Sequence, residues 1–137
     1  MSKSTSPYPA LSVDATGTGI VSHAGAVTVL RTAEVTGLTA AMSEQLAQWR
    51  KPLARYDPGK IIVDLAVSLA LGGDCLADVA TLREHTGVFG TVPSDPKVSR
   101  PISTLAGDAP PVLTAIESAH AHARAAAWRH AGASAPD

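Results

Sequence analysis

The chain has 137 residues, enough for one modest domain, and 45% of them are hydrophobic, which excludes a disordered polymer. The net charge of −1 and the isoelectric point near 6.5 argue against a strong nonspecific nucleic-acid binder, because such proteins are usually markedly basic. Residues 1–9 lack the apolar core of a signal peptide, and the most apolar run is too short to span a membrane. We therefore expect a cytoplasmic protein.

The two ends of the chain are predicted to be disordered. Residues 1–9 are polar with two prolines, and residues 133–137 form a small polar tail. We expect one helical domain over residues 10–132, because no linker divides it. Short apolar runs flank a glycine-containing turn near its start, which predicts a β-hairpin over residues 11–22.

Two helices are predicted in the first half of the domain. Residues 24–37 show apolar residues at helical spacing, and Gly37 is a C-terminal stop. Thr39 is then expected to cap a second helix that runs to about Arg50, with Trp49 on its apolar face.

Two further helices are predicted to form the core and one side of the bundle. Residues 60–71 are apolar nearly all round, so we place this helix at the centre, with Leu65 and Leu69 buried. The longest helix is predicted from Ala109 to about Ala131. Its expected buried stripe is Val112, Leu113, Ile116, Ala119, Ala123, Ala127 and Trp128.

The stretch between these helices predicts a helix-turn-helix-like segment. Asp74 is a good N-cap for a first helix, which Gly87 and Gly90 end. Ser94 offers a second N-cap, with Asp95 and Pro96 in the favoured first turn. The fold class is therefore predicted as mainly α: a small helical bundle with this segment and the N-terminal hairpin.

The order and spacing of residues along this stretch, together with residues upstream of it, resemble a known family. The matching residues are Ser22, His23, Ala24, Gly25, Gly37, Leu38, Gly72, Gly73, Asp74, Asp78, Leu82, Arg83, Phe89, Gly90, Ser94, Asp95, Pro96, Val98, Ser99 and Arg100. The chain resembles the N-terminal region of bacterial insertion-sequence transposases of the DDE type, those with a transposase DDE domain of group 1. The resemblance covers roughly residues 11–128.

The resemblance implies a role in DNA transposition. The family's catalytic carboxylates lie on a ribonuclease H-like core that begins just after such a region, in a strand that alternates hydrophobic residues with aspartates. No such strand occurs in this sequence, which ends in GASAPD. We therefore expect a truncated, non-enzymatic fragment that needs no cofactor. Its implied partner is double-stranded DNA at the element's terminal inverted repeats, with a homo-oligomer as an open alternative and no membrane.

Four residues at the start of the helix near Ser94 are the predicted DNA contacts. Lys97 and Arg100 lie one turn apart and could bind phosphates or guanine edges, while the Ser94 and Ser99 hydroxyls could bind phosphates. The alternative interpretation is an ordinary capped surface helix. Pro101 removes a helical hydrogen bond, so we expect a kink or a restart of the helix there.

Other polar residues predict no site. Asp74 and Asp78 could bind a metal, but a capping role for Asp74 and a backbone or Arg83 contact for Asp78 are favoured. The lone Cys75 is expected to be a small buried residue. Four side chains of the last helix are expected to face solvent: Glu117, His120, His122 and His130. Ser22 and His23 are expected to form no catalytic triad.

Two other classes of function remain open from the sequence. One is a small helical interaction module that dimerises through Trp49 and the apolar faces of its helices. The other is a cytoplasmic enzyme, although no constellation of catalytic groups is evident. A basic stripe through Arg50, Lys97 and Arg100 would favour DNA binding, whereas a broad exposed apolar patch would favour the interaction module.

Overall fold

The computed structural model describes residues 6–10 and 25–136, and in these residues the chain is mainly α-helical, as predicted. The predicted hairpin over residues 11–22 lies outside the described residues. The elements in chain order are α1 (Ala26–Val35), α2 (Leu38–Gln45), η1 (Ala47–Trp49), α3 (Pro58–Ala70), η2 (Leu76–Asp78), α4 (Val79–Arg83), α5 (Thr86–Phe89), α6 (Asp95–Ala106), α7 (Ala109–Ala131) and η3 (Gly132–Ser134).

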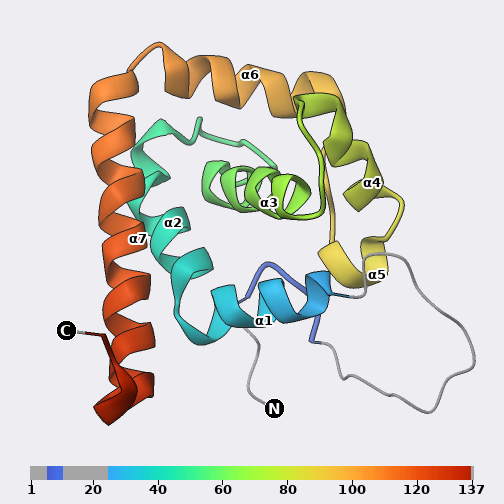
Figure 1. Cartoon of the computed structure of the whole chain (residues 1–137). Helices are drawn as coiled ribbons and strands as arrows, with labels where there is room; N and C mark the ends of the chain where they lie inside the picture. The colour runs from blue at the N-terminus through green and yellow to red at the C-terminus, as the bar shows by residue number, and fades with distance from the viewer. Residues whose placement is uncertain (1–5, 11–24, 137) are drawn as a thin grey trace, which may run out of the picture.

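Helix α3 lies at the centre of the bundle, with the other helices around it (Figure 1). Asp57 caps it by accepting a hydrogen bond from the Gly59 N–H at 2.9 Å, and Pro58 occupies the first turn, where a missing N–H costs nothing. Gly59 allows α2 to approach closely, because a Cβ there would lie 2.5 Å from the Ser43 backbone. The predicted central position is confirmed.

The buried face of α3 differs from the predicted one. Leu65 is half-buried and Leu69 is 60% exposed, so the prediction that both lie in the core is wrong. Asp64 and Ser68 occupy the inward positions instead, beside Ile61, Val63 and Val67. The apolar content of this helix is nearly uniform around its axis, so hydrophobicity alone did not select the face.

A buried polar network explains how Asp64 is accommodated. The Asp64 carboxylate accepts a hydrogen bond from the Tyr8 hydroxyl at 2.6 Å and from the Lys60 ammonium at 2.7 Å, and Asp64 is only 2% exposed. The Lys60 ammonium also lies 4.7 Å from the centroid of the Tyr8 ring. Tyr8 itself is buried, so the prediction of a disordered tail over residues 1–9 is wrong for this residue.

Helices α1 and α2 meet at a sharp corner. Gly37 has a φ of 73°, a left-handed conformation that suits glycine, and this ends the first helix at the predicted place. Thr39 is buried inside α2 and does not cap it, and α2 ends at Gln45, before the short helix η1. The predicted capping role of Thr39 is therefore wrong, because the chain already turns at Gly37.

Helix α7 has the predicted bounds and packs along α2 (Figure 1). Its buried stripe consists of Val112, Ala115, Ala119, Ala123 and Ala126. Leu113 and Trp128 are 58% and 49% exposed, so their predicted burial is wrong. The small alanines let the two helices lie close together, which leaves the larger side chains on the outer face. The chain continues as η3 (Gly132–Ser134), so residues 133 and 134 of the tail predicted over 133–137 form part of a short helix.

The predicted helix-turn-helix is not supported. The stretch expected to form its first helix consists of η2, the five-residue α4 and the four-residue α5. His85, at φ −121° and ψ 58°, interrupts the helical path, and Gly90, at φ 67°, ends it. The second predicted helix does begin after Ser94, as α6. No helix of the described residues is long and apolar enough to cross a membrane.

The Tyr8 hydroxyl is expected to contribute measurably to stability. Tyr8→Phe keeps the ring but leaves one Asp64 oxygen without its buried donor, which should lower the free energy of unfolding by about 1–3 kcal/mol. Urea unfolding followed by circular dichroism measures the change. Tyr56→Phe, at the chain's other tyrosine, is the matched control. Equal stability of parent and Tyr8→Phe would contradict this role.

Candidate nucleic-acid interface

Helix α6 carries the predicted DNA contacts and lies across one edge of the bundle (Figure 1). Val98 and Leu105 are buried against the core, which turns Lys97 and Arg100 to the outside, where both are exposed. The helix is continuous from Asp95 to Ala106, so the restart expected at Pro101 is not found. The basic side chains therefore project from one continuous helix that contains Pro101.

The start of α6 is fixed by Arg83 of α4. The Arg83 guanidinium donates to the Pro93 carbonyl oxygen at 2.8 Å and forms an ion pair with the Asp95 carboxylate at 2.7 Å. Arg83 is therefore neutralised by a partner within the fold. Its contacts hold the connection between α5 and α6 in place, which sets the direction in which Lys97 and Arg100 point.

The four predicted contact residues are not equally available. Ser94 is exposed at the N-cap position, and its side chain makes no capping hydrogen bond. Ser99 is half-buried, and its hydroxyl donates to the Pro96 carbonyl oxygen at 3.3 Å. The side chains of Lys97, Arg100 and Ser94 thus face solvent, whereas Ser99 is partly occupied inside the helix.

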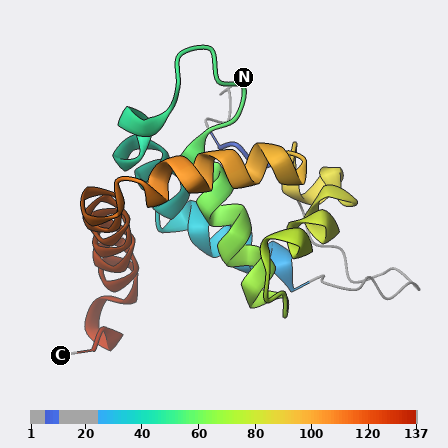
Figure 2. The same cartoon turned by 90° about the horizontal axis from the view of Figure 1, so that it is seen from above.

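The loop between η1 and α3 brings more cations to this side of the molecule. We call residues 50–57 the basic loop; it projects from the body of the protein in Figure 2. The Tyr56 ring at its base is half-buried against the core. Lys97 Nζ lies 5.7 Å from the centroid of this ring, and the Arg55 guanidinium carbon lies 5.6 Å from it. Tyr56 therefore joins the basic loop to α6.

We group five cations under the name basic face, namely Arg50, Lys51, Arg55, Lys97 and Arg100, because Arg55 of the loop and Lys97 of α6 share the Tyr56 ring and the others belong to the same loop or to the same helix. All five are exposed, and none of them forms an ion pair within residues 6–10 and 25–136. The two nearest acids along the chain have other partners. Asp57 accepts from the Ser43 hydroxyl and the Gly59 N–H, and Asp95 pairs with Arg83. The positive charge of the basic face is consequently not balanced inside the fold.

The sequence pointed to part of this face and missed its centre. The sequence analysis names Arg50, Lys97 and Arg100 as a possible basic stripe, but it does not indicate that Tyr56 connects the basic loop to Lys97. The available signal was an aromatic residue directly after a basic run, which is typical of nucleic-acid-binding surfaces. The ring's position beside α6 depends on contacts that no local pattern shows.

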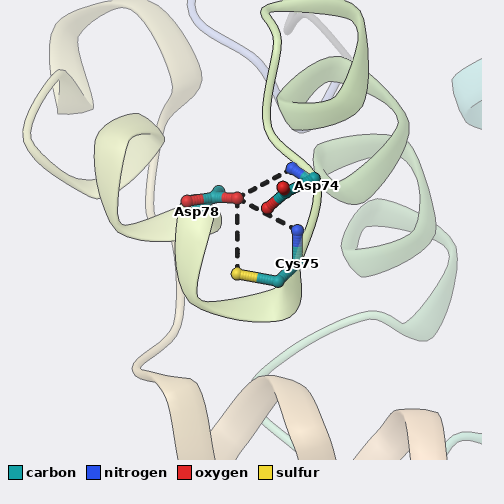
Figure 3. A group of neighbouring side chains, drawn as sticks. All are labelled: Asp74, Cys75 and Asp78. Atoms are coloured by element: carbon teal, nitrogen blue, oxygen red, sulfur yellow. Dashed lines mark hydrogen bonds between the residues drawn. The ribbon is translucent and has the colours of Figure 1, made fainter.

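A second group of side chains lies between α3 and α4. Asp74, Cys75 and Asp78 bring their ligand atoms within 4.8 Å of one another, the one such group of three in the described residues. One oxygen of Asp78 accepts from the Asp74 N–H at 2.8 Å, the Cys75 N–H at 3.0 Å and the Cys75 thiol at 3.3 Å (Figure 3). Asp78 thus closes a turn of the backbone.

This turn corrects two predictions. Cys75 is exposed, not buried, and it occupies the N-cap position that was expected for Asp74. The backbone contact predicted as one role of Asp78 is confirmed. The hydrogen bond from the Asp74 N–H, followed by those from Cys75, holds the pKa of Asp78 below the usual range of an aspartate.

The remaining polar candidates are dispersed. The four residues on α7, namely Glu117, His120, His122 and His130, are all exposed, as expected for solvent-facing side chains. Ser22 and His23 lie outside the described residues.

Comparison with known proteins assigns the chain to a family. The sequence model described as transposase DDE domain group 1 matches residues 3–134. The chain belongs to this family. No curated protein and no solved structure matches it. The matched residues include the basic loop, α6 and the turn at Asp78. Membership of this family indicates a function related to transposition.

The turn at Asp78 should be visible in an acid titration. Because the pKa of Asp78 is lowered in the folded chain, its contribution to stability is present above the unfolded pKa and is lost as the pH falls through the folded value. We expect the Asp78 carboxyl carbon to titrate below the usual range by nuclear magnetic resonance. A peptide of residues 70–85 is the control, in which Asp78 should titrate in the usual range of an aspartate. An equal pKa of Asp78 in the peptide and in the folded chain would contradict the hydrogen-bonded turn.

Proposed function

We propose that this chain is a DNA-binding and assembly portion of a DDE transposase that recognises the terminal inverted repeats of its element in the cytoplasm. The observation that supports this most directly is the gathering of Arg55 and Lys97 around Tyr56. The two cations come from segments about forty residues apart in sequence, yet they share one ring. Exposed cations beside an aromatic ring suit the phosphate backbone of DNA.

The near-neutral net charge is compatible with this function, because DNA binding depends on the positive charge at the contact surface and not on the net charge of the whole chain. Among the described residues, Arg31, Lys60 and Arg83 each have an acidic partner, whereas the five cations of the basic face and Arg124 and Arg129 of α7 have none. A small number of phosphate contacts gives moderate affinity that falls steeply with salt. Additional parts of a transposase, or a second copy of the chain, would increase the affinity by multivalency.

Lys97 and Arg100 are expected to carry salt-dependent binding. Replacing both with alanine should weaken binding of a labelled terminal-repeat duplex and reduce the slope of log affinity against log salt by about one unit per lost phosphate contact. Fluorescence anisotropy at several salt concentrations measures both quantities. Binding should fall equally on a scrambled duplex if these residues contact only phosphates.

The matched control is the double variant Arg124→Ala with Arg129→Ala. It removes the same charge from α7, where both residues are exposed. We expect this control to bind like the parent. If the α6 variant and the control behave alike, the first turns of α6 are not part of the interface, and only the long-range field of the protein would be involved.

We further propose that this chain does not itself cleave DNA. The sequence offers no strand with paired aspartates, and the one described group of three candidate ligands has its Asp78 oxygen engaged by three donors. A metal-dependent nuclease needs carboxylates free to hold divalent ions.

Incubation with element-end DNA and Mg²⁺ or Mn²⁺ should therefore yield no nicks and no strand transfer. Gel electrophoresis of end-labelled DNA provides the measurement. Metal-dependent cleavage by the parent that disappears in Asp74→Ala or Asp78→Ala would contradict the proposal and assign a catalytic role to this turn.

A helical interaction module is the second candidate, and one observation favours it. An apolar groove of about 350 Å³ lies between α1, α2 and α3, lined among others by Val29, Leu38, Met42, Ile62 and Val67. Trp49, the residue first considered for dimerisation, is half-buried and donates to Asp108 at 2.9 Å. A chain that ignores DNA but elutes as a dimer in size-exclusion chromatography would favour this candidate.

A further inference from the structure

The tip of the basic loop has an unusual conformation. Leu53 has a φ of 64°, and it is the one residue other than glycine with a positive φ in residues 6–10 and 25–136. Its side chain is fully exposed. The Ala54 N–H donates to the Lys51 carbonyl oxygen at 3.0 Å, and the Arg50 guanidinium donates to the Ala54 carbonyl oxygen at 3.0 Å. These bonds hold the turn that presents Leu53.

Both features of Leu53 oppose folding of the isolated chain. A left-handed backbone is unfavourable for a residue with a Cβ, and a leucine in water gains nothing from burial. No packing of the side chain offsets these costs, because it is fully exposed. Local strain that persists without a structural benefit is characteristic of binding sites.

The surroundings of Leu53 indicate the chemistry of its partner. Arg50, Lys51 and Arg55 flank it, and no acidic residue lies between positions 50 and 56. Tyr56 and Asp57 anchor the base of the loop, since Tyr56 packs on the core and Asp57 caps α3. A rigid base with a basic rim and an apolar tip fits a polyanion that has an apolar interior. Duplex DNA has this character, with phosphates at the groove edges and stacked bases between them.

We propose that the tip of the basic loop enters the minor groove of duplex DNA and inserts Leu53 between two base pairs, while the flanking cations bind the adjacent phosphates. This inference rests on the DNA-binding function proposed above and adds a mode of contact to it. Apolar wedges of this kind unstack a base step and kink the duplex by about 20–90°. Lys97 and Arg100 then contact the backbone beside the kink, because Tyr56 places Lys97 against the loop.

Bending of a duplex labelled with donor and acceptor dyes at its two ends tests the insertion. The duplex carries TA steps, which kink most easily. The parent chain should bind and increase energy transfer. Leu53→Asn should abolish that increase and weaken binding roughly tenfold, because the wedge is lost while the phosphate contacts remain. Asparagine tolerates the left-handed conformation, so this variant should fold and melt like the parent.

Two matched variants separate the wedge from the charges. Leu53→Met replaces the branched leucine with an unbranched apolar side chain of similar volume and should retain bending. Lys51→Ala should reduce the salt dependence of binding by about one unit of slope and leave the bend in place. A Leu53→Asn variant that bends DNA like the parent would overturn the insertion.

The outcomes also distinguish this inference from the function on which it rests. If the parent binds through Lys97 and Arg100 but Leu53→Asn changes nothing, only the insertion fails. If the parent does not bind the duplex, both proposals fail. Binding of the parent to vesicles with anionic lipid, lost in Leu53→Asn, with no effect on DNA bending, would assign the tip to a membrane surface and overturn the proposal.

Discussion

The buried carboxylate of Asp64 is the constraint around which the bundle is arranged. Helix α3 passes through the centre, so a charge on its inner face must be paired. Burial raises the pKa of Asp64, and the Lys60 ammonium and Tyr8 hydroxyl act in the opposite direction. Burial, followed by the nearby Asp64 charge, raises the pKa of Tyr8 far above its usual value, so its hydroxyl remains a donor. Removing either partner would leave an uncompensated buried group.

The N-terminal segment owes its position to this network and in turn connects distant parts of the fold. Ser6 donates to Glu34 of α1 at 2.6 Å, and Tyr8 binds Asp64 of α3. The backbone of Pro7 approaches Gly90 so closely that a Cβ there would lie 3.1 Å from the Pro7 carbonyl oxygen. Three consecutive residues, 6–8, thus join α1, α3 and the connection that leads into α6. The direction of the basic face is therefore linked to the core through a short segment, residues 6–10, that contains two prolines and the buried Tyr8.

The correct sequence predictions mainly concern helix bounds, which depend on near neighbours, whereas the wrong ones mainly concern side-chain burial, which depends on residues distant in sequence. The start of α6 after Ser94, the corner at Gly37 and the full extent of α7 were predicted, because a proline in the first turn, glycine conformations and periodic patterns act within a few residues. The helix-turn-helix failed because His85 interrupts its first helix. The sequence predicts DNA contacts at Lys97 and Arg100 of the proposed interface, but it does not indicate that Tyr56 brings the basic loop beside Lys97.

The sequence by itself determined a mainly helical chain, the family to which it belongs and the charged residues available for an interface. Only the tertiary structure decided which side of α3 faces inward, because Tyr8, which lies 56 positions from Asp64 in the sequence, had to meet Asp64 there. Only it placed Lys97 of α6 against Tyr56 of the basic loop. The physical reason is the same in both cases. Pairing of a buried charge and packing of an aromatic ring depend on residues far apart in sequence, whereas helix formation depends on near neighbours.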